Sequence, residues 1–182
     1  KIILFPGRIT EWKGQIDFLS VIKKLNNQNI ITLFVGDTKN IKYSQCLQNN
    51  INKLGLKSIC KIINNLNKDE MKKIYSISDI ILSLPKRPEG FGRVISESLS
   101  MKKIILAFDF GGAADQLKGL SSIFKIYPGD YGELDKKILS VLDLNKDENS
   151  NLGNISRQHI KKHFSVHQMV EKYKSYYERI SL

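Results

Sequence analysis

Residues 79–97 read DIILSLPKRPEGFGRVISE and contain the pattern that decides the fold. Asp79–Leu84 is an apolar run that ends at Pro85, which predicts a buried strand followed by a loop. From about Gly92 to Met101 the apolar residues then have the spacing of a helix. The unit is therefore a strand, a loop and a helix, with glycines and charged residues gathered in the loop.

The same unit recurs along the chain. Further strands are expected at Ile2–Phe5, Ile31–Val35, Cys60–Ile63, Ile104–Phe108 and Ser122–Ile126. Further helices are expected at Gln15–Leu25, Tyr43–Leu54, Asp69–Ile77 with Asp69 as its cap, Tyr131–Leu144, Asn151–Phe164 and Val166–Ser181, with Asp147–Gly153 as a polar linker. Apolar strands that alternate with helices indicate a parallel sheet covered on both faces. We therefore predict an α/β fold with a doubly wound, Rossmann-like sheet.

The composition limits the classes of partner. The 182 residues include 29 Lys and Arg against 18 Asp and Glu, a net charge of +11 that favours anionic partners. Basic residues are spread along the chain without interleaved aromatic residues, so nucleic-acid binding is not expected. Cys46 and Cys60 show neither metal-ligand spacing nor a framework of disulfide bridges, which fits a reducing compartment such as the cytoplasm. No apolar run approaches the roughly 20 residues that span a bilayer.

Ligands of doubly wound sheets bind at the carboxyl ends of the strands. The first such loop, Pro6–Gly14, carries Arg8 and Lys13 five residues apart, next to the glycines Gly7 and Gly14. Arginine can bind two phosphate oxygens at once and lysine adds a compact charge, so the pair suits a diphosphate. Two solvated surface charges remain an alternative interpretation.

The loop after Leu84 gives the more specific signal. Glu89 lies on the loop and Glu97 on the following helix, with seven residues between them. Gly90 and Gly92 allow a ligand to approach the backbone at the start of the helix. A loop carboxylate can hold sugar hydroxyls, and a helix carboxylate can accept both hydroxyls of a ribose. The alternative is two glutamates on a solvated face.

A glycine pair follows the strand Ile104–Phe108. Gly111 and Gly112 open the next helix, a geometry that offers backbone amides to an anion. A turn that needs positive φ explains the two glycines equally well.

Together the three loops resemble the C-terminal domain of the retaining glycosyltransferase family numbered four, which has the two-domain GT-B fold. The residues that carry the resemblance are Gly7-Arg8 with Lys13-Gly14, Glu89-Gly-Phe-Gly with Glu97, and Gly111-Gly112 followed by Asp115. Within that family the chain is most similar to mannosyltransferases of bacterial lipopolysaccharide core synthesis.

The resemblance implies roles for these residues. Arg8 and Lys13 would grip the diphosphate of a nucleotide sugar and stabilise it as it leaves, and Glu89 would hold the transferred sugar. Glu97 would bind the ribose. The remaining donor-binding residues would be Gly7, Asn65, Gly90, Phe91, Gly92, Gly111 and Gly112. Sugar transfer with retention would then need no metal ion and no cofactor. The family usually has a glycine at Asn64-Asn65, which leaves the base open, and Glu where this chain has Asp115.

The acceptor site of this family lies in an N-terminal domain that the chain does not resemble anywhere. A chain that starts at once with a strand predicts that this domain is missing, so we expect the fragment to be inactive alone. A glycan or lipid would be the acceptor, and Val166–Ser181 would pack on the missing domain through Val166, Val170, Tyr173 and Tyr177, unless it packs on its own domain. The charge of the chain would hold this cytoplasmic protein at an anionic membrane surface.

Other interpretations remain at this point. One is a sugar-nucleotide epimerase of related GT-B fold, and another is a basic anion-binding module. His159, His163 and His167 are spaced by four, but Phe164-Ser165 predicts a helix break with Ser165 as the new cap, so no metal site is expected.

Overall fold

The computed structural model describes residues 1–25 and 29–180 and contains a six-stranded sheet in the order β3-β2-β1-β4-β5-β6. Every neighbouring pair of strands is parallel. The strands are β1 (Ile2–Pro6), β2 (Ile31–Val35), β3 (Cys60–Ile63), β4 (Ile80–Ser83), β5 (Ile104–Phe108) and β6 (Lys125–Ile126). The predicted doubly wound parallel sheet is confirmed.

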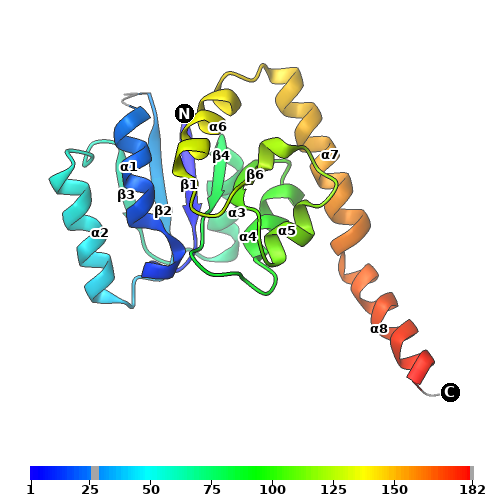
Figure 1. The fold of residues 1–182 in the computed structure, drawn as a ribbon. Helices are drawn as coiled ribbons and strands as arrows, with labels where there is room; N and C mark the ends of the chain where they lie inside the picture. The colour runs from blue at the N-terminus through cyan, green and yellow to red at the C-terminus, as the bar shows by residue number, and fades with distance from the viewer. Residues whose placement is uncertain (26–28, 181–182) are drawn as a thin grey trace.

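Helices cover both faces of this sheet (Figure 1). They are α1 (Gln15–Leu25), α2 (Ile41–Lys53), α3 (Lys68–Ile77), α4 (Arg93–Ser100), α5 (Gly112–Leu117), α6 (Tyr131–Leu142), α7 (Lys146–Phe164) and α8 (Val166–Ile180), with 3-10 turns η1 (Glu11–Lys13) and η2 (Ser122–Phe124). The chain runs outward from β1 to β3, returns to the centre at β4 and runs outward to β6 in the other direction. Right-handed crossovers then place α1 and α2 on one face and α4 and α5 on the other.

The core lies between the sheet and these helices. All residues of β4 and β5 are buried, as expected for central strands covered on both faces. On the other half of the sheet, the ring of Phe5 lies 5.8 Å from that of Phe18 and 5.7 Å from that of Phe34. Each fully buried side chain of this size contributes about 1.5–3 kcal/mol. The strand ends, where the loops begin, are therefore firmly positioned.

Polar caps move several helix boundaries from their predicted places. Asn67, not Asp69, caps α3, because its side chain accepts hydrogen bonds from the amides of Asp69 and Glu70 in a capping box. Asn145 and Glu148 form a second capping box at the start of α7. The prediction of a linker over Asp147–Gly153 is therefore wrong: that segment is helical.

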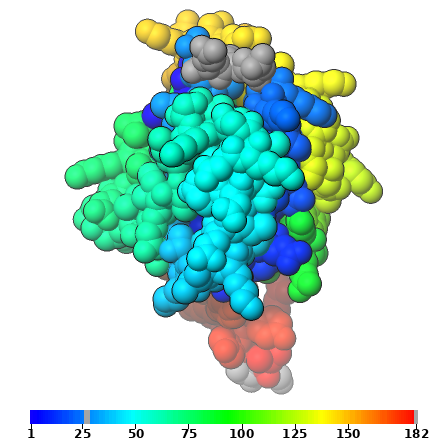
Figure 2. All heavy atoms as spheres, turned by 90° about the vertical axis from the view of Figure 1, so that its left-hand side faces the viewer, coloured from blue at the N-terminus to red at the C-terminus, as the bar shows by residue number. Residues whose placement is uncertain are grey.

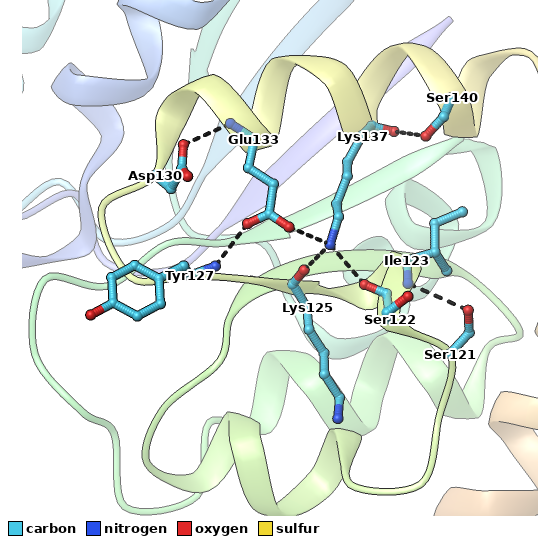
Figure 3. A network of polar contacts seen from close by, with 9 residues as sticks. All are labelled: Ser121, Ser122, Ile123, Lys125, Tyr127, Asp130, Glu133, Lys137 and Ser140. Atoms are coloured by element: carbon cyan, nitrogen blue, oxygen red, sulfur yellow. Dashed lines mark hydrogen bonds and ion pairs between the residues drawn. The ribbon is translucent and has the colours of Figure 1, made fainter.

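The last predicted strand is also shorter than expected. Ser122–Phe124 forms the turn η2, in which the Ser121 hydroxyl accepts a hydrogen bond from the Ile123 amide, and only Lys125–Ile126 pairs with β5. The segment is held instead by α6, as Figure 3 shows. Lys137 donates hydrogen bonds to the carbonyls of Ser122 and Lys125. The network thus ties a short edge strand to a helix.

Helix α8 projects from the body of the molecule, as the red segment in Figure 1 and Figure 2 shows. The predicted break before it is confirmed: α7 ends at Phe164, and the hydroxyl of Ser165 accepts a hydrogen bond from the amide of Gln168. No residue of α8 is buried, and Val166, Val170, Tyr173 and Tyr177 are each at least half exposed. Ser181, the predicted last residue, lies outside the described residues.

Candidate functional site

A cavity of about 1220 Å³ lies at the carboxyl ends of the central strands. Pro6 and Val35, at the ends of β1 and β2, form part of its floor. The chain reverses its direction of winding between β1 and β4, and this is the place where ligands of such sheets bind. The structure therefore has an open cavity where the fold predicts one.

The loop after β1 brings Lys13 into this cavity. Gly14 has a left-handed conformation (φ 80°), and a Cβ atom there would lie 2.4 Å from the carbonyl oxygen of Leu84. Only glycine allows the loop to lie this close to the end of β4. Lys13 is consequently 9% exposed although it carries a charge.

Lys13 pairs with Glu89, which comes from the loop after β4. The distance from Lys13 Nζ to Glu89 Oε1 is 2.5 Å, and the two side chains are 11% and 19% exposed. Lys13 Nζ also lies 4.5 Å from the centre of the Trp12 ring, and the Arg8 guanidinium lies 5.6 Å from the same ring. Trp12 thus contacts both cations, a role that the sequence did not predict.

Both predicted cations and both predicted carboxylates line the same cavity. Arg8 and Lys13 approach it from the β1 loop, Glu89 from the β4 loop and Glu97 from α4. Arg8 and Glu97 are exposed, whereas Lys13 and Glu89 are largely enclosed. The four side chains therefore share one cavity, in which Lys13 and Glu89 are shielded from solvent and Arg8 and Glu97 are not.

The backbone between Glu89 and α4 turns at Gly92. Gly92 precedes α4 in a left-handed conformation (φ 73°), and a Cβ atom there would lie 3.7 Å from Glu89 Oε2. Gly90, Phe91 and Gly92 all line the cavity. Phe91 is 46% exposed, and its ring packs 6.2 Å from that of Phe164 at the end of α7. Phe91 is therefore a wall residue.

Glu97 has a partner that the sequence analysis missed. The hydroxyl of Tyr75, on α3, donates a hydrogen bond of 2.9 Å to Glu97 Oε2. Burial, together with the nearby Glu97 carboxylate, raises the pKa of Tyr75 well above its usual value, so the phenol stays a donor. In the sequence, a tyrosine on an amphipathic helix resembles an ordinary core residue. The only sign of a further role is that a buried tyrosine hydroxyl needs a hydrogen-bond partner.

Gly7 and Asn65 also line the cavity. Neither Gly111 nor Gly112 is among the described residues that line it. The Gly112 amide donates a hydrogen bond of 2.8 Å to the Glu89 carbonyl, and a Cβ atom on Gly112 would lie 2.5 Å from the Phe91 oxygen. Gly111 and Gly112 therefore pack against the backbone of the loop that carries Glu89.

Four further cations line the cavity and were not predicted: Lys68, Lys72, Arg93 and Lys161. They come from α3, α4 and α7. Cations outnumber carboxylates among the lining side chains, so the cavity favours an anionic ligand.

His159 and His163 lie on α7, where His159 contacts α5, and His167 lies on α8. His159 Nε2 lies 2.9 Å from the Gln116 carbonyl oxygen, and the His159 and His163 rings are 5.0 Å apart. Over residues 1–25 and 29–180, no group of three or more His, Cys, Asp or Glu side chains is placed to hold a metal ion. No helix in these ranges has the length and apolar character needed to cross a membrane.

Solved structures of similar fold are numerous. A glycosyltransferase from Rickettsia africae is 31% identical, with a TM-score of 0.89 over 98% of this chain and 47% of its own. Anabaena HepE, solved in complex with UDP and glucose, is 23% identical, with a TM-score of 0.84 over 96% of this chain and 48% of its own. Sucrose-phosphate synthase from Thermosynechococcus elongatus is 16% identical, with a TM-score of 0.84 over 98% of this chain and 45% of its own.

The chain spans about half the length of these similar proteins. Among curated proteins no match is found. The family model described as glycosyl transferases group 1 matches residues 1–159, which include every site residue predicted from the sequence. The chain belongs to the glycosyl transferases group 1 family.

Proposed function

We propose that this chain is the donor-binding half of a retaining glycosyltransferase. The complete enzyme would transfer a sugar from a nucleotide-diphosphate sugar to a glycan or lipid acceptor. The observation that supports this most directly is that Arg8, Lys13, Glu89 and Glu97 line one cavity at the switch point of the sheet. HepE, which shares the fold, has been solved in complex with UDP-glucose.

The two cations of the β1 loop suit the diphosphate. Arg8 is exposed and can turn toward a ligand, whereas Lys13 is fixed by Glu89 and Trp12. As the bond to the sugar breaks, negative charge grows on the leaving phosphate oxygen. A fixed cation in a partly enclosed site stabilises this charge without having to reorient during the reaction.

Glu89 has two functions in this proposal. Its carboxylate holds the Lys13 ammonium in place, and its remaining lone pairs accept hydrogen bonds from sugar hydroxyls. Because Lys13 Nζ contacts this carboxylate at 2.5 Å, Glu89 acts as a hydrogen-bond acceptor in this scheme. The incoming hydroxyl would attack on the face that the diphosphate leaves, which retains the configuration. No metal ion takes part in this scheme.

Residues beyond the cavity complete the proposal. The acceptor would bind to a second domain, and the exposed apolar side chains of α8 would pack against that domain. The net charge of +11 would keep the cytoplasmic enzyme near an anionic membrane surface. The similarity noted in the sequence makes a mannosyltransferase of lipopolysaccharide core synthesis the more specific proposal.

Binding of nucleotides to the chain tests the donor site. Trp12 is the only tryptophan and contacts both cations, so its fluorescence should change when a diphosphate binds. UDP, GDP and ADP, each free and linked to glucose or mannose, would be titrated against the chain, with calorimetry as a second method. We expect one base to bind, and Arg8→Ala, Lys13→Ala and Glu97→Ala each to weaken binding at least tenfold.

Arg157→Ala is the matched control. Arg157 is exposed on α7 and does not line the cavity, so the nucleotide affinity should not change. Binding of any polyanion that falls with salt and ignores the site variants would instead support a basic anion-binding module. Conversion of a sugar nucleotide by the full-length protein without acceptor would support an epimerase.

A further inference from the structure

One of the residues that line the cavity is a buried tyrosine, Tyr75. Tyr75 is 2% exposed, whereas Glu97, to which it donates a hydrogen bond, is exposed on α4. Tyr75 comes from α3 and Glu97 from α4, and the two positions are 22 residues apart in the sequence. A buried donor from one helix therefore fixes the carboxylate of another.

We propose that Tyr75 is the positioning residue that orients Glu97 toward a ribose diol. The inference rests on the proposed nucleotide-sugar function. An unrestrained glutamate on a helix surface samples several side-chain conformations and loses that freedom when it binds a ligand. The Tyr75 hydroxyl removes part of this freedom before the ligand arrives, and such preorganisation increases affinity.

The donor count fits a ribose. A carboxylate has about four lone-pair sites, and the Tyr75 hydroxyl occupies one of them on Oε2. Oε1 and the other lone pair of Oε2 remain for the cavity, which Glu97 lines. Two adjacent hydroxyls can then donate one hydrogen bond each. A sugar without these hydroxyls would leave the oriented carboxylate without its ligand donors.

The local charges support the same geometry. Tyr75 keeps its proton at neutral pH because burial and the Glu97 carboxylate both disfavour the phenolate. It therefore donates to Glu97 throughout the pH range in which a nucleotide would be tested. Arg93, one turn before Glu97 on α4, also lines the cavity and leaves the carboxylate in a positive surrounding.

The experiment compares ribose with a sugar that lacks the diol. The affinity of UDP, GDP and ADP, and of their 2′,3′-dideoxy forms, would be measured on the 182-residue chain and on Tyr75→Phe. The substitution keeps the ring and removes only the hydroxyl. We expect the ribose form that binds to weaken about tenfold, which corresponds to about 1.4 kcal/mol. The dideoxy form should change less than twofold.

A double variant separates positioning from packing. If Tyr75 acts through Glu97, then Tyr75→Phe should add less than twofold to the loss caused by Glu97→Gln. Tyr43→Phe is the matched control, because Tyr43 is a half-buried tyrosine whose hydroxyl contacts the Ile16 amide and which does not line the cavity. Its affinity for both nucleotide forms should equal that of the unmodified chain.

The outcomes distinguish the two proposals. Equal weakening of ribose and dideoxy forms by Tyr75→Phe, or no weakening of either, would overturn the positioning role and leave the donor site intact. If no ribonucleoside diphosphate binds to the unmodified chain, the donor site itself fails, and the positioning role fails with it. Thermal unfolding of each variant shows whether a loss of affinity comes from a loss of folded protein.

Discussion

Removal of the Lys13 charge should affect both stability and binding. In Lys13→Met the aliphatic part of the side chain is retained, but the ammonium that faces Glu89 at 2.5 Å is lost. Glu89, with its side chain 19% exposed, would then keep a largely enclosed carboxylate without a partner. An uncompensated charge of this kind is expensive, so the variant should be less stable than the unmodified chain.

The magnitude follows from the geometry. Two unit charges 2.5 Å apart attract each other by about 7 kcal/mol at an effective dielectric constant of about 20. Desolvation of both groups offsets most of this attraction. Exposed pairs contribute roughly 0.2–1 kcal/mol, and breaking a fully buried pair costs about 3–5 kcal/mol. Because Lys13 and Glu89 lie between these limits, we expect a coupling of about 2 kcal/mol.

A double-mutant cycle measures this coupling. Urea unfolding of the unmodified chain, Lys13→Met, Glu89→Gln and the double variant gives the four free energies. The single variant Lys13→Met should also melt about 4–8 °C lower, since a chain of this size loses about 2–4 °C per kcal/mol. Because the pair is largely enclosed, 0.5 M NaCl should reduce the coupling only slightly. A coupling below about 0.5 kcal/mol, or one that disappears in salt, would refute the reasoning.

Two further substitutions test the support of the site and the α6 network. Gly112→Ala should lower the free energy of unfolding, measured in urea, by about 2 kcal/mol, because its Cβ would lie 2.5 Å from the Phe91 oxygen. It should also weaken nucleotide binding. Gly90→Ala is the control: the space around Gly90 is open, so stability should not fall. Glu133→Gln should lower stability by about 0.5 kcal/mol at pH 7. The hydrogen bonds that Glu133 accepts from Lys137 and the Tyr127 amide lower its pKa. In pH-dependent thermal unfolding, this difference in stability should therefore be fully present above the ordinary pKa of a glutamate and vanish as the pH falls through the lowered pKa. Unchanged stability in Gly112→Ala, or a Glu133 effect that grows in acid, would contradict these expectations.

The sheet could be predicted because its strands are continuous apolar runs with polar or glycine residues at their ends. β5 (Ile104–Phe108) begins after lysines and ends before Asp109, and its bounds agree with the prediction. The start of α7 could not be predicted in the same way. Its first two turns contain few apolar residues, and helix formation there depends on the Asn145 capping box, which outweighs the weak periodicity.

The sequence predicted several of the residues that line the site but not which of them contact one another. Glycine and charge patterns placed Lys13 and Glu89 on loops that end at the same edge of the sheet. Their contact required the close approach of Gly14 to the end of β4, which no local pattern encodes. The same limit explains the misplacement of Gly112, because a glycine that meets a ligand and one that meets a neighbouring loop look alike in sequence.

The ion pair between Lys13 and Glu89 joins positions 76 residues apart, across the two central strands. During synthesis, Lys13 leaves the ribosome well before Glu89. The two central strands, β1 and β4, can pair only after β4 has been made. Contacts of such long sequence separation form slowly. If the chain binds a nucleotide as proposed, this ability should be among the last properties gained as the chain folds, so ligand binding would serve as a kinetic marker of the completed sheet.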